Sequence, residues 1–163
     1  MSPNHFTQAG VDYLVKASKF IKRVPAPSPI DRSGLGRPAA QRILAEVFRK
    51  SEPGNPVRSL IIVASLSPPP TGLPRPYPSS ALVWCGRRIR GLNYEIWHDN
   101  PDGTIVRGWH EHVWSPEYQD SLVMRAMPQP KRRGLRDVFQ WGCSQWNIEI
   151  LEEQLEVLRG EDD

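Results

Sequence analysis

A turn in the middle of the chain constrains the fold more than any other feature of the sequence. Residues 99–103 read Asp-Asn-Pro-Asp-Gly, and each of these residue types favours a reversal of the backbone. Runs rich in aromatic and β-branched residues flank the turn over residues 92–98 and 104–114. Two such runs joined by a short turn predict a β-hairpin, so we expect an antiparallel sheet that contains it.

The predicted hairpin holds three of the four histidines of the chain. Because successive side chains of a strand point to opposite faces, His110 and His112 should lie side by side on one face. His98 precedes the turn and can approach this pair. The opposite face is expected to carry Arg107, Trp109, Glu111 and Val113. We therefore predict that His98, His110 and His112 form the functional centre.

Paired histidines suit acid–base chemistry. Two imidazoles that titrate near neutrality can divide the general acid and general base roles that cleavage of an RNA phosphodiester requires. Guanidinium groups nearby can stabilise the charged phosphorane. We expect this role for Arg107, Arg87, Arg88 or Arg90, provided that the fold brings them to the histidine face. The route needs neither a metal nor another cofactor.

A His-x-His segment also suits metal binding. Such a pair presents two ligands to Zn, Fe or Mn, with His98, Glu111 or Asp99 as a third. Alternation points Glu111 away from the pair, which weakens this reading, so we predict no metal. A purely structural role, in which the imidazoles bond backbone carbonyls, is a further alternative.

The first third of the chain is basic and is expected to be helical. Apolar residues recur at helical spacing over residues 8–24, and lysines fill the other positions. A linker rich in Pro, Gly and Ser follows over residues 25–38, and a second helix then runs to Pro53. Residues 1–58 hold ten Lys/Arg against four Asp/Glu, which suits either nucleic acid or a solvated helix face. We expect residues 1–55 to form a helical N-terminal extension.

The rest of the chain is expected to form a second domain over residues 56–160. Apolar, β-branched runs predict strands at residues 59–66 and 81–89, separated by a proline-rich loop at residues 67–80. A long amphipathic helix is predicted over residues 135–159. The element order indicates an α+β fold, with a small antiparallel sheet of about four strands packed by the C-terminal helix.

A second basic run precedes the last predicted helix. The sequence Lys-Arg-Arg-Gly-Leu-Arg places positive charges where the helix dipole favours acids, so another role is worth considering. We consider Lys131, Arg132 and Arg133 as phosphate-binding residues. A solvent-exposed basic run is the alternative.

The lack of a recognisable targeting signal and the spacing of the cysteines predict a cytoplasmic protein. No continuous apolar run approaches the roughly 18 residues that span a bilayer, and the first residues lack the order of a secretory signal. Cys85 and Cys143 lie far apart, without the spacing of a zinc knuckle or a disulfide framework. We expect both cysteines in the core and no contact with a membrane.

Several features follow one another in a fixed order from residue 59 onward. They are an apolar strand, a proline-rich interruption, an aromatic-x-Asp-Asn turn, a Gly-x-His-x-His segment and a Leu-x-Asp-Val-Phe helix start. The residues that carry them include Asp99, Asn100, Gly108, His110, His112, Leu135, Asp137, Val138 and Phe139. In this order, residues 59–148 resemble the TumE-like toxins of bacterial toxin–antitoxin modules. The first 55 residues have no counterpart in that resemblance.

The resemblance implies a small intracellular toxin that acts on RNA, with a cognate antitoxin protein as its partner. On this basis we predict a metal-independent endoribonuclease, with His110 and His112 as acid and base and His98 assisting. Asp99 and Asn100 would be the turn residues of the motif. One alternative is a non-enzymatic module, phage or defence related, that binds nucleic acid or protein through the basic N-terminal helix and the proline-rich loop. The other is a His-x-His metalloprotein.

Overall fold

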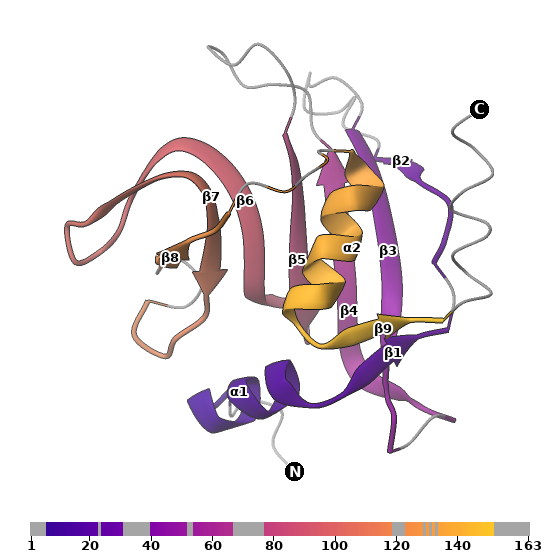
Figure 1. The fold of residues 1–163 in the computed structure, drawn as a ribbon. Helices are drawn as coiled ribbons and strands as arrows, with labels where there is room; N and C mark the ends of the chain where they lie inside the picture. The colour runs from indigo at the N-terminus through magenta and orange to yellow at the C-terminus, as the bar shows by residue number, and fades with distance from the viewer. Residues whose placement is uncertain are drawn as a thin grey trace.

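A mixed β-sheet of nine strands dominates the part of the chain that the computed structural model describes (Figure 1). The described residues are 6–22, 24–30, 40–51, 54–66, 77–118, 123–128, 130, 132 and 134–151. The strands are β1 (Lys19–Ile21), β2 (Ser28–Ile30), β3 (Ala40–Arg49), β4 (Pro56–Leu66), β5 (Pro78–Trp84), β6 (Arg87–Asp99), β7 (Ile105–Val113), β8 (Val123–Ala126) and β9 (Ile148–Ile150). The described helices are α1 (Gln8–Lys16) and α2 (Leu135–Gln145), and neither is long and apolar enough to cross a membrane.

The sheet is built mainly from strands that are neighbours in sequence. Their order is β8-β7-β6-β5-β4-β3-β1-β9, with β2 pairing β3. Each pair from β3 to β8 is antiparallel, whereas β1 and β9 run parallel at the other edge. Figure 1 shows α2 crossing one face of β4 and β5, while β6 and β7 curve away from the rest of the sheet at the left. The β6–β7 hairpin therefore projects beyond the part of the sheet that α2 covers.

The core lies between α2 and the central strands. The buried residues of α2 recur at helical spacing and are Leu135, Val138, Phe139, Gly142 and Cys143. They face an apolar core that includes Ile43, Ile62 and Leu82 from β3, β4 and β5. A Cβ at Gly142 would lie 2.5 Å from the hydroxyl oxygen of Ser80, so glycine is what lets α2 approach β5 this closely.

The predicted α+β fold with about four strands is wrong. Residues 40–49, expected in a helix, form β3, which pairs with β2 and β4. In this strand Ile43, Ala45 and Val47 are buried, while Leu44 is half-buried and Glu46 is exposed. Alanine and glutamate favour helices on their own. Hydrogen bonding to the neighbouring strands, together with the burial of every second side chain, outweighs that preference.

The predicted N-terminal helical extension and long C-terminal helix are also wrong. The helix expected over residues 8–24 ends at Lys16, and the chain continues into β1, which lies in the sheet between β3 and β9. The last helix ends at Gln145 because Asn147 adopts a left-handed conformation, with φ 53°, that leads into β9. Residues 152–159 of the predicted helix lie outside the described residues.

The two cysteines occupy different environments. Cys143 is buried in the core, as predicted, and burial raises the pKa of its thiol to about 12. Cys85 was expected in the core but is exposed in the turn between β5 and β6, where its φ is 47°. Both cysteines are free thiols.

Lys19, the first residue of β1, caps the C-terminal end of α1 with its side chain. The residue is only 1% exposed, and its ammonium donates hydrogen bonds to the carbonyl oxygens of Leu14 (2.7 Å), Val15 (3.1 Å) and Ala17. A cation is favourable at this end of a helix. Burial nevertheless lowers the pKa of Lys19 to about 8.

We therefore expect the free energy of unfolding to rise with pH just above pH 8. Between pH 8 and 9 the folded protein loses the Lys19 proton. The unfolded chain keeps this proton, because there the pKa of the lysine is 10.5. The unfolded state then binds more protons, so stability increases by at most about 1 kcal/mol over this pH unit. Above pH 9 the Cys143 thiol acts in the opposite sense, because it ionises only in the unfolded chain. Urea unfolding of the wild type and of Lys19→Met at both pH values checks this, and an equal rise in the variant would contradict it.

Candidate functional site

The predicted β-hairpin is confirmed, since β6 and β7 pair antiparallel on either side of the turn that follows Asp99. His110 and His112 lie on one face of β7, as alternation predicts. The register between the two strands shifts between Glu95 and His98, where β6 contains one extra residue. Such a β-bulge re-aims side chains, and here it brings Glu95 and His98 onto the face that carries the histidine pair.

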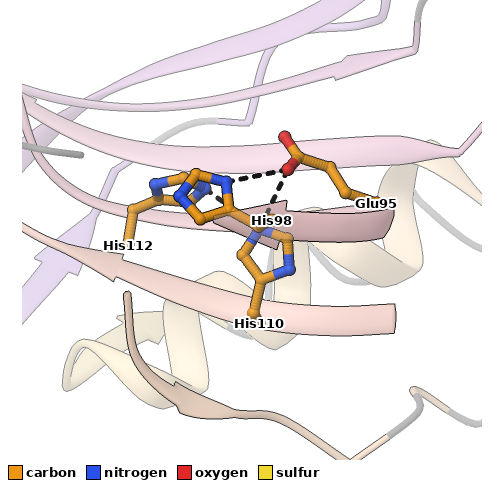
Figure 2. A group of neighbouring side chains, drawn as sticks. All are labelled: Glu95, His98, His110 and His112. Atoms are coloured by element: carbon orange, nitrogen blue, oxygen red, sulfur yellow. Dashed lines mark hydrogen bonds and ion pairs between the residues drawn. The ribbon is translucent and has the colours of Figure 1, made fainter. Parts of the chain in front are cut away.

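The four side chains Glu95, His98, His110 and His112 converge, and we call them the histidine cluster (Figure 2). Nε2 of His110 lies 3.0 Å from Nε2 of His112 and 3.9 Å from Oε2 of Glu95. Nδ1 of His98 lies 2.9 Å from that same glutamate oxygen. One nitrogen or oxygen from each side chain, four atoms in all, lies within 4.8 Å of the others.

The histidine cluster is buried on one side and open on the other. His110 is 0% exposed and His112 is 3% exposed. The side chains of His98 and Glu95 are 18% and 39% exposed. Solvent therefore reaches the cluster from the side of Glu95 and His98, while the two histidines of β7 form its floor.

The backbone of β7 fixes the orientation of His110. Its Nδ1 donates a hydrogen bond of 2.9 Å to the carbonyl oxygen of Gly108, so Nε2 points its lone pair into the cluster. Gly108, whose carbonyl accepts this bond, has a φ of 80°, a conformation that favours glycine. Burial lowers the pKa of His110, which favours the neutral imidazole. A neutral ring held by a carbonyl at its other nitrogen is the usual form of a histidine that ligates a metal.

The geometry of the histidine cluster suits a transition-metal ion. Zinc lies about 2.0–2.2 Å from imidazole nitrogens and carboxylate oxygens, so two ligands of one ion are at most about 4.2–4.4 Å apart. The distances that involve His110 and Glu95 fall within this limit. The most distant pair of ligand atoms is at most 4.8 Å apart, so it must approach by about half an ångström for one ion to bind all four atoms. The partly exposed side chains of Glu95 and His98 can make this movement.

The opposite face of the hairpin carries a separate polar network. Glu111 points away from the histidines, as alternation predicts, and its carboxylate accepts a hydrogen bond of 3.0 Å from the indole of Trp146. Nε of Arg90 lies 3.9 Å from the same carboxylate, and its guanidinium also lies 3.6 Å from Asp12. Arg90, which we expected to hold phosphate, is therefore committed to a buried structural network.

The other three hairpin arginines lie in different places. The guanidinium of Arg87 lies over the ring of Phe6, 5.2 Å from its centroid. Arg107 is exposed on β7, and by alternation it points away from the histidines. Arg88 packs over Gly91, beside the histidine cluster. The structure thus brings one of the four predicted arginines to the site.

Of the three basic residues considered before α2, the structure describes Arg132, and the cavity that it lines includes no residue of the histidine cluster. Arg132 lines a cavity of about 510 Å³ on the side of α2, together with Asp137 and Trp141. Lys131 and Arg133 lie outside the described residues.

The two predicted turn residues shape the hairpin loop. Asp99 is the exposed last residue of β6. Asn100 is buried, and its side-chain amide donates a hydrogen bond of 2.8 Å to the hydroxyl of Thr104 across the turn. Neither residue contributes to the histidine cluster, so both are explained by the turn itself.

Glu95 is the site residue that the sequence reasoning missed. Three positions separate it from His98, so simple alternation places the two side chains on opposite faces of β6. The β-bulge cancels this difference. An acidic residue close to a histidine in the same strand was the available signal, but the face of its side chain depends on the bulge.

Comparison of the chain with known protein families, with curated proteins and with solved structures finds no match. The resemblance of residues 59–148 to TumE-like toxins therefore stays a prediction.

Proposed function

We propose that this protein is a metalloprotein that binds one transition-metal ion through Glu95, His98, His110 and His112. The observation that carries the proposal is the convergence of four ligand atoms within 4.8 Å, from two adjacent strands. The hydrogen bond from His110 to the Gly108 carbonyl supports it, because that bond directs the ligand nitrogen into the cluster.

The ligand set narrows the class of metal. Imidazole suits Zn, Cu, Fe and Ni, whereas Mg and Ca prefer oxygen ligands. Three imidazoles and one carboxylate therefore favour Zn²⁺ or Fe²⁺ over the alkaline-earth ions. An ion that takes more than four ligands keeps an open position on the exposed side of the cluster. There it can polarise a bound oxygen or activate water.

Burial favours a metal over direct acid–base catalysis by the histidine pair. A general acid or base must come within hydrogen-bond reach of the group with which it exchanges a proton. His110 has no exposed surface, so a substrate cannot touch its ring in this conformation. A substrate that binds a metal ion at the mouth of the cluster need not touch the ring of His110.

Metal-independent cleavage of RNA, with an antitoxin as partner, is our second hypothesis. The 3.0 Å contact between the rings of His110 and His112 and the nearby Arg88 favour it, because both supply groups that phosphodiester cleavage uses. Protein stripped of metal with EDTA distinguishes the two hypotheses. Cleavage of RNA by the stripped protein would support the ribonuclease, and activity only after metal is restored would support the metalloprotein.

Elemental analysis and titration with Zn²⁺ or Co²⁺ test the metal site directly. We expect about one ion per folded chain in the wild type and strongly reduced binding in Glu95→Ala and His112→Ala. Glu95 is partly exposed, so its removal should leave the fold intact, and circular dichroism verifies this for each variant. His5→Ala is the matched control, because it removes a histidine that belongs to neither β6 nor β7. A wild type that binds no metal, or a Glu95→Ala variant that binds as well as the wild type, would refute the proposal.

A further inference from the structure

Arg88 lies at the end of the histidine cluster that His112 forms. A Cβ built on Gly91 would be 3.0 Å from Cδ, 3.3 Å from Nη1 and 3.4 Å from Nε of Arg88. Gly91 is the cross-strand partner of His112, and cross-strand partners share a face of the sheet. The missing side chain at Gly91 therefore makes room for the guanidinium on the histidine face.

The charge of Arg88 acts on the cluster. The guanidinium of Arg88 packs over Gly91, which lies directly opposite His112 on β7, so the positive charge is on the histidine face next to His112. The guanidinium is thus close enough for its field to reach a group on the floor of the site. A cation beside a metal site is unusual unless an anion lies between the two, because like charges repel in a partly buried site.

The charges of the metal-loaded site point the same way. Neutral imidazoles add no charge, so a divalent ion with Glu95 as its one anionic ligand retains a net charge of about +1. Arg88 adds a positive charge at the His112 end. Such a site attracts an anion to the open position of the metal.

We infer that the metal and Arg88 together bind an anionic oxygen group, the phosphate or carboxylate of a substrate. One oxygen would bind the metal, and another would accept hydrogen bonds from the guanidinium of Arg88. Guanidinium carries five N–H donors in a planar fork that matches both kinds of anion, so Arg88 can keep its present contacts while it binds one. This inference rests on the proposed metal site.

The other arginines of the hairpin do not share this placement. Arg90 is held by Glu111 and Asp12 on the opposite face, and Arg87 stacks on Phe6. Arg87 is adjacent in sequence, exposed and equally charged. It therefore offers a matched control for the removal of Arg88.

Spectroscopy on the Co²⁺-loaded full chain tests the inference. Inorganic phosphate and acetate are titrated separately while the visible d–d bands of Co²⁺ are recorded. In the wild type we expect at least one of the two anions to change the bands in a saturable way. Arg88→Gln should weaken this binding about tenfold or more, because it removes a charge-assisted hydrogen bond, and Arg88→Lys should weaken it less. Arg87→Gln should bind as the wild type does.

The outcomes separate this inference from the proposed function. A response to phosphate alone indicates a phosphorylated substrate, and a response to acetate alone indicates a carboxylate substrate. A response to both indicates an anion site that does not select between them. Each of these responses supports the inference if Arg88→Gln weakens it. Co²⁺ bound at about one ion per chain without any response to either anion would overturn the inference and leave the metal site standing. Equal affinities in Arg88→Gln and the wild type would do the same. Failure to bind Co²⁺ at all would overturn the proposed function and the inference with it.

Discussion

Zinc is expected to raise the melting temperature of the wild type by about 8–16 °C. An ion that binds only the folded state adds about 4 kcal/mol of stability when its free concentration is a thousand times the dissociation constant. For a chain of this length each kcal/mol raises the melting temperature by about 2–4 °C. The site lends itself to this linkage because its four ligands come from both β6 and β7 and exist together only when the hairpin is folded.

His98→Ala should remove most of this stabilisation. The side chain of His98 is partly exposed, so its loss leaves the core unchanged, but the metal loses one of its four ligands. A hundredfold weaker affinity reduces the shift to about a third at the same zinc concentration. Differential scanning fluorimetry with and without Zn²⁺ measures both proteins, and His5→Ala should keep the full shift. The same shift in His98→Ala as in the wild type would show that zinc stabilises the protein elsewhere.

The hairpin could be predicted because its signal is local. Turn residues at positions 99–103 and the alternating pattern on either side require no knowledge of the rest of the fold, and β6 and β7 pair as expected. The face shared by His110 and His112 follows from alternation within one strand. These parts of the site depend on few neighbours, so the sequence was sufficient for them.

Glu95 could not be placed because its face depends on the register. Asp99 pairs with Ile105, and continuous counting from that pair would set Glu95 opposite Trp109, whose ring contacts Trp141 of α2 on the other face of the hairpin. The bulge between Glu95 and His98 sets it opposite Gly108 instead. A shift of one residue moves a side chain to the other face, and the sequence carries no clear sign of the extra residue.

The errors in the fold have a similar origin. The apolar residues of β3 are spaced so that they fit either a helix or a strand, and only pairing with β2 and β4 decides between them. At the end of α2, the apolar pattern of the sequence continues beyond Gln145, and a helix was expected to continue with it. Asn147 was the available stop signal, since asparagine tolerates the left-handed conformation that it adopts there.

Glu111→Ala should destabilise the protein by about 3–5 kcal/mol, a large share of the 5–15 kcal/mol that is typical of a folded domain. Glu111 is 7% exposed, and its carboxylate is both the acceptor for the Trp146 indole and the buried counter-charge of Arg90. Asp12, the other acidic partner of Arg90, has a side chain that is 42% exposed and lies 3.6 Å away, so it compensates only partly. The variant leaves the Trp146 indole N–H without this acceptor and removes one of the two acidic partners of a buried guanidinium.

Glu111→Gln separates the two roles of this carboxylate. Its amide oxygen can still accept the hydrogen bond from Trp146, but it no longer balances the charge of Arg90, so we expect a smaller loss than in Glu111→Ala. Urea unfolding measures both variants, and Glu46→Ala, at an exposed position of β3, should stay within about 0.5 kcal/mol of the wild type. Because Glu111 faces away from the histidine cluster, folded Glu111→Gln should still bind Co²⁺. A Glu111→Ala protein as stable as the wild type would show that the network contributes little. Loss of Co²⁺ from folded Glu111→Gln would instead show that the two faces of β7 are coupled. In that case Glu111 would hold in place the backbone that carries the ligands His110 and His112.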